Sequence, residues 1–387
     1  MLYPPLSMLY LDKGDIAKAE TAVNKASTAG IDSTDTKYVK GVLLFKQNKN
    51  QEALAAFDSV LQTDANNADA LNFRGQTLER LDKKDEATAA YQKAAAADPN
   101  NPTLAFDEGV ASYNKGDYAN AEIAYKKAIA ADPKNYQAHA NLASTYRQLE
   151  RYPEANAEYK LASEGIKTSD LYSEWGFCLG KAAEWDKAVD RLNTAKEITP
   201  TAVDNNNVGW AHYNAGFAQT ASKNDQGAKA SFAAGKPFLQ SAVQQDPKLD
   251  AAYVNLGATH NALGEYQEAV TALNTANTLH PGWTIALNQL GMGYRGLKDF
   301  AQAINVFKAV VDLDGNSVSG LFNLGEAFNA SGNKKEAKKI NDRLKKLDPT
   351  LAATLNDIFS GKIPTVGVPA VKVPTVSVPK PKLPKFP

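Results

Sequence analysis

Cysteine is almost absent from this sequence. Cys178 is its single copy, so no disulfide can form within the chain, and its place inside a predicted helix favours a packed, unreactive thiol. The four histidines are scattered without HxxxH or HExxH spacing, and no CxxC motif occurs. The sequence therefore predicts no disulfide framework, no metal site and no bound cofactor.

Long apolar runs, an excess of one charge and catalytic motifs are missing as well. No run of about 18 apolar residues exists, so no transmembrane helix is predicted. The 43 basic residues balance 43 acidic ones, and the chain lacks the basic excess on which nucleic-acid binding depends. There is no GxSxG or GxxxxGK[ST] motif, and Gly291-Met292-Gly293 lies in a predicted helix with no strand before it. These absences favour a protein that is not an enzyme.

What the sequence does contain is a repeat of about 34 residues. In most copies a glycine precedes a fixed alanine by twelve positions, and in about half of them an aromatic residue follows that alanine by four. Between residues 250 and 351, three copies superimpose without a gap. Periodicity of this length is typical of a solenoid. In the first half the alanines are Ala19, Ala53, Ala87, Ala121, Ala155 and Ala188.

Each copy has the apolar spacing of two helices. In the copy that starts near residue 250, Leu256 and Leu263 lie on one face of a first helix, while Leu273 and Ala276 lie on one face of a second. Gly264, between them, can take the left-handed conformation that ends a helix. Each copy therefore predicts a helical hairpin.

Small residues at the eighth and twentieth positions, an aromatic near the eleventh and a proline at the thirty-second make the chain resemble the tetratricopeptide repeat (TPR) family. The resemblance covers roughly residues 1–350. It implies an all-α fold, a right-handed α-solenoid of about ten hairpins with a capping helix and an extended tail. The simple, alanine-rich repeats suggest the bacterial multi-repeat type.

The repeat divides the sequence into five predicted segments. Residues 1–202 hold six repeats, the first of them clipped at its start, and residues 203–249 hold an atypical repeat with a helical insertion of about 14 residues. Residues 250–351 hold three regular repeats. Residues 352–361 have the spacing of a capping helix, and residues 362–387 form a tail rich in Pro, Val and Lys.

The insertion and the tail each leave alternatives. Ala218 to Lys236 is rich in Ala, Lys, Gln and Ser, which favours lengthened helices, either as a tolerated addition or as a surface for a partner. From Pro364 to Pro379 a proline recurs every five residues, which favours polyproline-like extension. The tail is a solvated spacer, a ligand for a proline-binding groove, or a strand lying back on its own solenoid.

The start of the chain shows no signal peptide, because residues 1–11 lack a basic segment followed by an apolar core and a cleavage site. Leu6, Leu9 and Tyr10 are predicted to form the buried face of a first helix. We therefore expect either a cytoplasmic protein or a trimmed form of an exported, periplasmic one.

In the TPR family the first helices of the hairpins line a concave face that holds a ligand. The sixth position is repeatedly an amide here, which resembles the asparagine ladder that holds extended peptides in some TPR proteins. An amide both donates and accepts, so it suits a peptide backbone, and nearby aromatic and cationic groups would add stacking and charge. Alternatively, the asparagines only bridge neighbouring helices. The implied groove comprises Asn141, Asn207, Trp210, Tyr213, Asn255, Asn288, Gln289, Arg295, Phe322 and Asn323.

Two functions are compatible with these features. The first is a non-enzymatic scaffold that binds an extended segment of another protein in the groove. The carboxylate clamp of chaperone-binding TPR proteins needs a lysine at the fifth position, which no repeat has here, so chaperone tails are not expected as ligands. The second is an architectural or assembly element of a bacterial envelope complex, acting through the insertion or the C-terminal tail.

Overall fold

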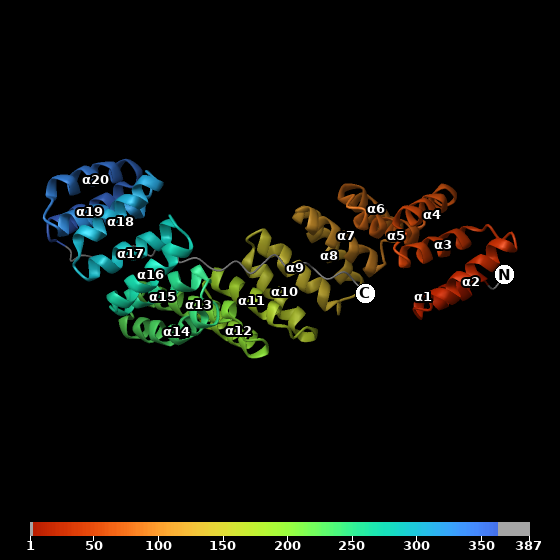
Figure 1. Cartoon of the computed structure of the whole chain (residues 1–387), viewed down its shortest axis with the longest axis horizontal. Helices are drawn as coiled ribbons and strands as arrows, with labels where there is room; N and C mark the ends of the chain where they lie inside the picture. The colour runs from red at the N-terminus through yellow and green to blue at the C-terminus, as the bar shows by residue number, and fades with distance from the viewer. Residues whose placement is uncertain (1–2, 363–387) are drawn as a thin grey trace. The chain divides into compact units, whose positions relative to one another are not determined.

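The computed structural model describes residues 3–362, so the tail predicted at 362–387 lies outside the described residues from residue 363 onward. These residues form 21 α-helices, paired as hairpins in chain order, and contain no strand (Figure 1). The predicted all-α fold of stacked hairpins is thus confirmed. None of the described helices is both long and apolar enough to cross a membrane.

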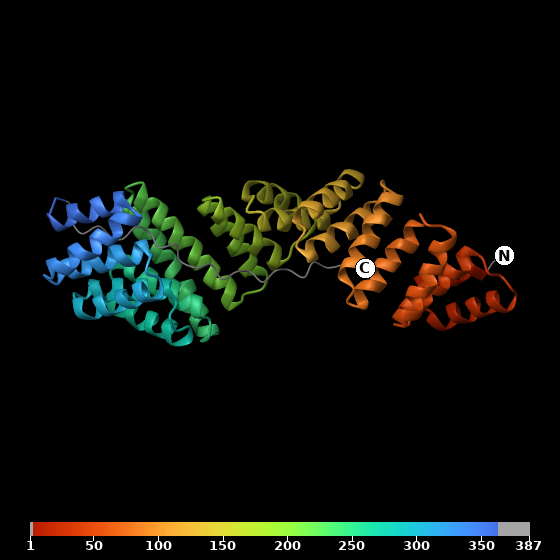
Figure 2. The same ribbon diagram turned by 90° about the horizontal axis from the view of Figure 1, so that it is seen from above.

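The described residues divide into two compact units, 3–167 and 168–362. Within each unit every helix packs against the next one along the chain (Figures 1 and 2). The first unit contains α1 (Tyr3–Asp12), α2 (Ile16–Thr28), α3 (Thr34–Lys46), α4 (Asn50–Thr63), α5 (Ala68–Arg80), α6 (Lys84–Ala97), α7 (Pro102–Lys115), α8 (Tyr118–Ala131), α9 (Tyr136–Gln148) and α10 (Tyr152–Gly165). The second contains α11 (Ser169–Lys181), α12 (Trp185–Ile198), α13 (Ala202–Ala221), α14 (Asp225–Gln245), α15 (Asp250–Leu263), α16 (Tyr266–Leu279), α17 (Thr284–Gly296), α18 (Phe300–Leu313), α19 (Val318–Ala330), α20 (Lys334–Leu347) and α21 (Pro349–Phe359).

Most first helices of the hairpins begin at a side chain that caps them. Oδ1 of Asn67 accepts a hydrogen bond from the N–H of Ala70 at 3.0 Å, and Oδ1 of Asn135 accepts one from Ala138 at 2.9 Å. Such a cap satisfies a backbone donor that the first turn of a helix leaves unpaired. The same role is filled by Ser33, Asn101, Thr168, Thr201 and Ser317.

The turn inside each hairpin needs a residue in the left-handed conformation. Gly264 and Gly332 supply it, at φ +78° and +84°, as the sequence predicts. Six other hairpins have a residue with a Cβ at this position, with φ between +57° and +62°. The left-handed conformation of such a residue costs about 1–2 kcal/mol of conformational energy. The packing of the two helices therefore imposes the turn. These residues are Asn48, Asp82, Glu150, Ala183, Lys223 and Lys298.

The two helices of a hairpin approach most closely at the glycine of the eighth position. A Cβ built on Gly109 would lie 2.6 Å from the ring of Tyr125, and one on Gly291 would lie 2.5 Å from the ring of Phe307. Both rings are fully buried. A side chain at either glycine would push the two helices apart. The contact between the glycine and the ring is therefore a central part of the core of these two hairpins.

The first helix differs from the prediction. Leu6 and Leu9 are exposed over 37% and 47% of their surface, whereas Ser7 and Leu11 are buried. Among the described helices α1 contacts only α2 and α3, so these two helices cover only part of its surface. Tyr10, the third predicted residue, is half-buried.

The hairpin of α13 and α14 is longer than its neighbours. These helices have 20 and 21 residues, against 13 or 14 in each of α15 to α20. The additional turns pack in the same way as the repeat, since a Cβ on Gly216 would lie 2.5 Å from the ring of Phe232. At the other end of the unit, α21 buries Leu355 and Ile358 against the last hairpin.

Candidate binding site

In each unit the first helices of the hairpins lie on the inner side of the stack. In the second unit α13 contacts α15, α15 contacts α17 and α17 contacts α19, whereas the second helices α14, α16, α18 and α20 do not contact one another. Helices in contact have axes about 8–10 Å apart, so the first helices are the more closely spaced row. The stack must therefore curve with the first helices inside, and α3, α5, α7 and α9 form the corresponding row of the first unit.

A pocket of about 630 Å³ opens in the second unit between the C-terminal halves of α13, α15 and α17. One wall is aromatic. The rings of Tyr213 and Phe217 lie 5.1 Å apart, and Phe232 of α14 lies 5.6 Å from Tyr213 and 6.2 Å from Phe217. Tyr266 and Met292 line the pocket as well. Phe217 and Phe232 lie within the additional turns, so the insertion builds part of this pocket.

Two amide side chains lie beside this aromatic wall. Nδ2 of Asn261 donates to the carbonyl oxygen of Gln289 at 2.8 Å and to its Oε1 at 3.1 Å. Oδ1 of Asn261 is buried and has no hydrogen-bond partner among residues 3–362. Burial raises the pKa of the Tyr213 hydroxyl well above its usual value, and the Gln289 side chain opposes part of that rise, so Tyr213 stays neutral. The wall of the pocket thus contains a buried acceptor without a partner, next to an apolar surface.

The pocket also contains one charged group that is held in place. Arg295 lines it with a side chain that is 16% exposed, and its guanidinium donates to the carboxylate of Glu326, which is fully buried. Burial raises the pKa of Glu326, and the charge of Arg295 opposes that rise. Because Glu326 orients the guanidinium, the other N–H groups of Arg295 can serve a ligand.

Three of the other predicted groove residues, Asn255, Asn288 and Asn323, form hydrogen bonds that bridge helices. Nδ2 of Asn255 donates to Oδ1 of Asn206 at 2.8 Å, which joins α15 to α13. Nδ2 of Asn323 donates to Oδ1 of Asn288 at 3.2 Å, which joins α19 to α17. All four side chains are buried. These amides fix how neighbouring first helices sit against each other.

We expect Asn255→Ala to lower the free energy of unfolding of the second unit by about 1–3 kcal/mol, because Oδ1 of Asn206 would lose its donor inside the protein. Urea unfolding followed by circular dichroism measures the change. Asn274→Ala, at an exposed position of α16, is the matched control and should change stability by less than about 0.5 kcal/mol. Equal effects of the two variants would show that the amide bridge contributes nothing.

Comparison with known proteins agrees with this architecture. Models described as tetratricopeptide repeat match residues 38–102, 113–173, 250–281 and 288–352, which together are more than half of the chain. The chain belongs to the tetratricopeptide repeat family. TPR folds are generally protein–protein interaction modules and typically non-catalytic, so the partners that the family implies are proteins. No curated protein matches the sequence.

Solved structures resemble the chain at low identity. Pseudomonas aeruginosa pilF is 19% identical over 52% of this chain and 92% of its own, with a TM-score of 0.46. The C-terminal part of a TPR protein from Cytophaga hutchinsonii is 16% identical over 65% of this chain and 98% of its own, with a TM-score of 0.49. YrrB, described as a TPR protein with an unusual peptide-binding site, is 17% identical over 60% and 97%, with a TM-score of 0.36.

The TPR stack brings three of the ten predicted groove residues, Tyr213, Gln289 and Arg295, into the pocket. The other seven do not line it: they are Asn141, Asn207, Trp210, Asn255, Asn288, Phe322 and Asn323. All seven are buried, as are Tyr213 and Gln289, and of the ten only Arg295 is partly exposed. Phe217 and Phe232 were not among the predicted groove residues. The sequence does contain a signal for them, because two phenylalanines in and beside a polar insertion are unusual in an otherwise regular TPR array.

The inner row of the first TPR unit contains a smaller pocket of about 360 Å³. The guanidinium carbon of Arg80 lies 3.5 Å from the centre of the Phe45 ring, and the Tyr91 hydroxyl donates to Glu79 at 2.9 Å. Oδ1 of Asn72 is buried there without a hydrogen-bond partner among the described residues. This pocket is more polar than that of the second unit and presents both charges.

Proposed function

We propose that this TPR protein is a non-enzymatic scaffold that binds an extended segment of another protein along the first helices of its second unit. The observation that carries the proposal is the pocket in which Tyr213, Gln289 and Arg295 lie together beside Phe217 and Phe232. Its volume of about 630 Å³ lies within the range of ligand sites, which are mainly apolar with a few placed polar groups.

The chemistry of the pocket suggests how a segment would bind. A large apolar side chain of the ligand would insert between the phenylalanine wall and Met292, because buried aromatic contacts dominate interface energies. Arg295 would donate to a backbone carbonyl or a carboxylate of the ligand. Only the anchoring side chain would be selected strongly, since the remaining contacts are to groups that every peptide carries.

The proposal predicts that filling the pocket blocks binding. Ala262 lines the pocket at an exposed position, so Ala262→Trp occupies the pocket without disturbing the core. Peptides selected by display against the intact chain should bind Ala262→Trp at least tenfold more weakly, as measured by fluorescence anisotropy. Ala230→Trp, at an exposed position of α14 that does not line the pocket, is the control and should leave the affinity unchanged. Equal affinity for both variants would rule out this pocket.

The second predicted function, an architectural or assembly element of a bacterial envelope complex, depends on the insertion or on residues 362–387. The additional turns of α13 and α14 direct Phe217 and Phe232 into the pocket, so part of the apolar surface of the insertion belongs to the scaffold site. We favour the scaffold for this reason. Light scattering of the intact chain measures self-association. Self-association that depends on concentration and is unaffected by Ala262→Trp would favour the assembly function instead.

A further inference from the structure

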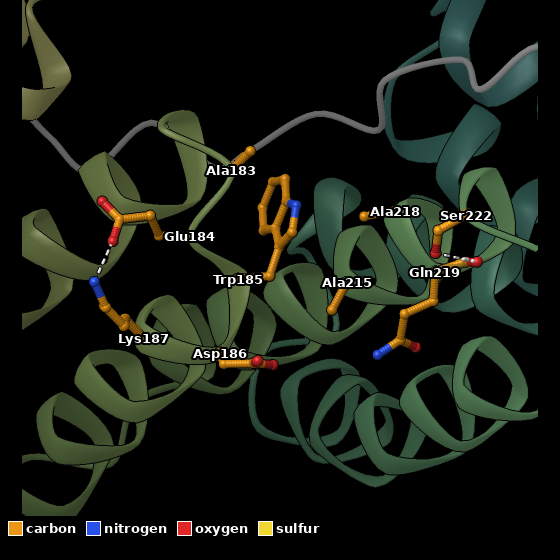
Figure 3. A pocket seen from close by; sticks show the side chains of 9 residues that line it. All are labelled: Ala183, Glu184, Trp185, Asp186, Lys187, Ala215, Ala218, Gln219 and Ser222. Atoms are coloured by element: carbon orange, nitrogen blue, oxygen red, sulfur yellow. Dashed lines mark hydrogen bonds and ion pairs between the residues drawn. The ribbon is translucent and has the colours of Figure 1, made fainter. Parts of the chain in front are cut away.

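A second cleft, of about 370 Å³, lies between the α11–α12 turn and the additional turns of α13 (Figure 3). It shares no lining residue with the large pocket. Trp185 stands on one side of the cleft, and Ala215 and Ala218 stand on the other. The cleft is open because these two small residues face a large ring. A TPR hairpin of ordinary length would end before this part of α13. The cleft is therefore a second consequence of the insertion.

Trp185 packs against other aromatic rings in this cleft. Its ring meets that of Trp210 edge to face, with centres 5.5 Å apart and planes at 74°, and Trp210 stacks on Phe177 at 6.1 Å. Figure 3 shows the indole standing beside Ala183, with its nitrogen turned toward Ala218. None of the residues that line the cleft hydrogen-bonds that nitrogen. The cleft thus presents an aromatic face and an N–H donor that none of the lining residues uses.

The rim of the cleft is acidic. Glu184 and Asp186 flank Trp185, and Lys187 pairs with Glu184. Asp186 is exposed and forms no ion pair among residues 3–362. One carboxylate is therefore available to a cation on a ligand, next to the aromatic surface.

A proline-rich segment that carries lysines fits this combination. Proline rings pack on aromatic faces, polyproline segments keep their carbonyl groups free to accept from an indole N–H, and lysine pairs with carboxylates. Beyond the described residues, the sequence 378–384 reads Val-Pro-Lys-Pro-Lys-Leu-Pro, and residues 363–387 contain four lysines and no acidic residue. The chain itself thus carries a ligand of this chemistry.

The length of the chain permits the contact. From α11 to α21 the first helices contact one another in five steps, each of about 8–10 Å, so the cleft lies roughly 40–50 Å from the end of α21. The 16 residues between Lys362 and Pro379 span about 50 Å in a polyproline conformation, at about 3.1 Å per residue. We propose that the cleft at Trp185 binds residues 378–384 of the same chain, a contact independent of the scaffold pocket.

The test uses the intact chain with Pro379, Pro381 and Pro384 replaced by alanine, titrated with a labelled synthetic peptide of residues 374–387 and followed by fluorescence anisotropy. This chain should bind the peptide in a saturable way. The natural chain should bind it at least tenfold more weakly, because its own segment competes at an effective concentration of the order of millimolar. In the proline-substituted chain, Trp185→Leu should weaken binding at least tenfold, whereas Trp283→Leu, at a tryptophan outside the cleft, should not.

A variant on the exposed rim tests the cleft without touching its packing. Asp186→Lys should weaken binding at least threefold and reduce its dependence on salt, because a favourable charge pair is lost. Unchanged affinity in both Trp185→Leu and Asp186→Lys would overturn the cleft as the site. Equal peptide affinity of the natural and proline-substituted chains would overturn the contact within one chain, as would a dimer in light scattering that Trp185→Leu dissociates.

Discussion

Arg295→Met is expected to lower the free energy of unfolding of the second unit by about 3–5 kcal/mol at pH 7, because it leaves the carboxylate of Glu326 buried without its counter-charge. Glu326 is fully buried; its Oε2 accepts from Arg295, and its Oε1 has no hydrogen-bond partner among the described residues. Methionine keeps the length and most of the apolar volume of the arginine stem, so the lost charge dominates the effect. Urea unfolding followed by circular dichroism measures it.

The pH dependence of this loss of stability distinguishes an effect of the Arg295 charge from an effect of its packing. Burial already raises the pKa of Glu326 from 4.5, and removing Arg295 removes the charge that opposes this rise. An acid whose pKa is higher in the folded state costs no stability below its unfolded pKa, and the cost grows as pH rises through the folded value. The effect of Arg295→Met should therefore be smallest near pH 4 and increase toward pH 7.

Glu326→Gln in the same chain is the control for this variant. The double variant should recover a large part of the loss at pH 7, since the glutamine is neutral, and its stability should vary less with pH. A loss that is independent of pH, or a double variant no more stable than Arg295→Met, would show that the packing of Arg295 rather than its charge matters.

The second large effect is expected at Phe307. Phe307→Ala should destabilise the second unit by about 3–5 kcal/mol, because the ring is fully buried against Gly291 and its removal leaves a cavity between α17 and α18. The same urea experiment measures the loss. Phe307→Leu retains more of the volume and should cost less than half as much. Phe300→Ala, at a half-buried position, should also cost less than Phe307→Ala. Similar losses for all three would mean that the close approach at Gly291 is not a major source of stability.

The fold could be predicted because its determinants are local and recur. Gly109 and Tyr125 stand at fixed positions of one repeat, and Gly291 and Phe307 stand at the same positions of another, so their contact repeats with the sequence. Helix starts could be read from the same period, since Asn67 and Asn135 cap helices two repeats apart. The left-handed turn at Ala183 could not be read in this way, because packing imposes it on a residue that does not favour it.

The site was only partly predictable. A helical period indicates which face of a helix points inward, and Tyr213, Gln289 and Arg295, which it places on that face, line the pocket. It does not indicate how far the next first helix covers that face, and for this reason Asn255 and Asn323 are buried. Whether such an amide faces a ligand or another amide depends on the spacing between hairpins.

The sequence by itself determined the helical hairpins, their order and the close contacts within each one, because these depend on residues fewer than about 34 positions apart that recur in every repeat. Only the tertiary structure decided which residues of the inner face stay accessible. It also decided that the insertion forms one wall of each of two separate clefts. Phe217 reaches the pocket, and Ala218 faces Trp185, because the lengthened hairpin passes neighbours that end earlier. Accessibility depends on how one hairpin packs on the next, and no single repeat contains that information.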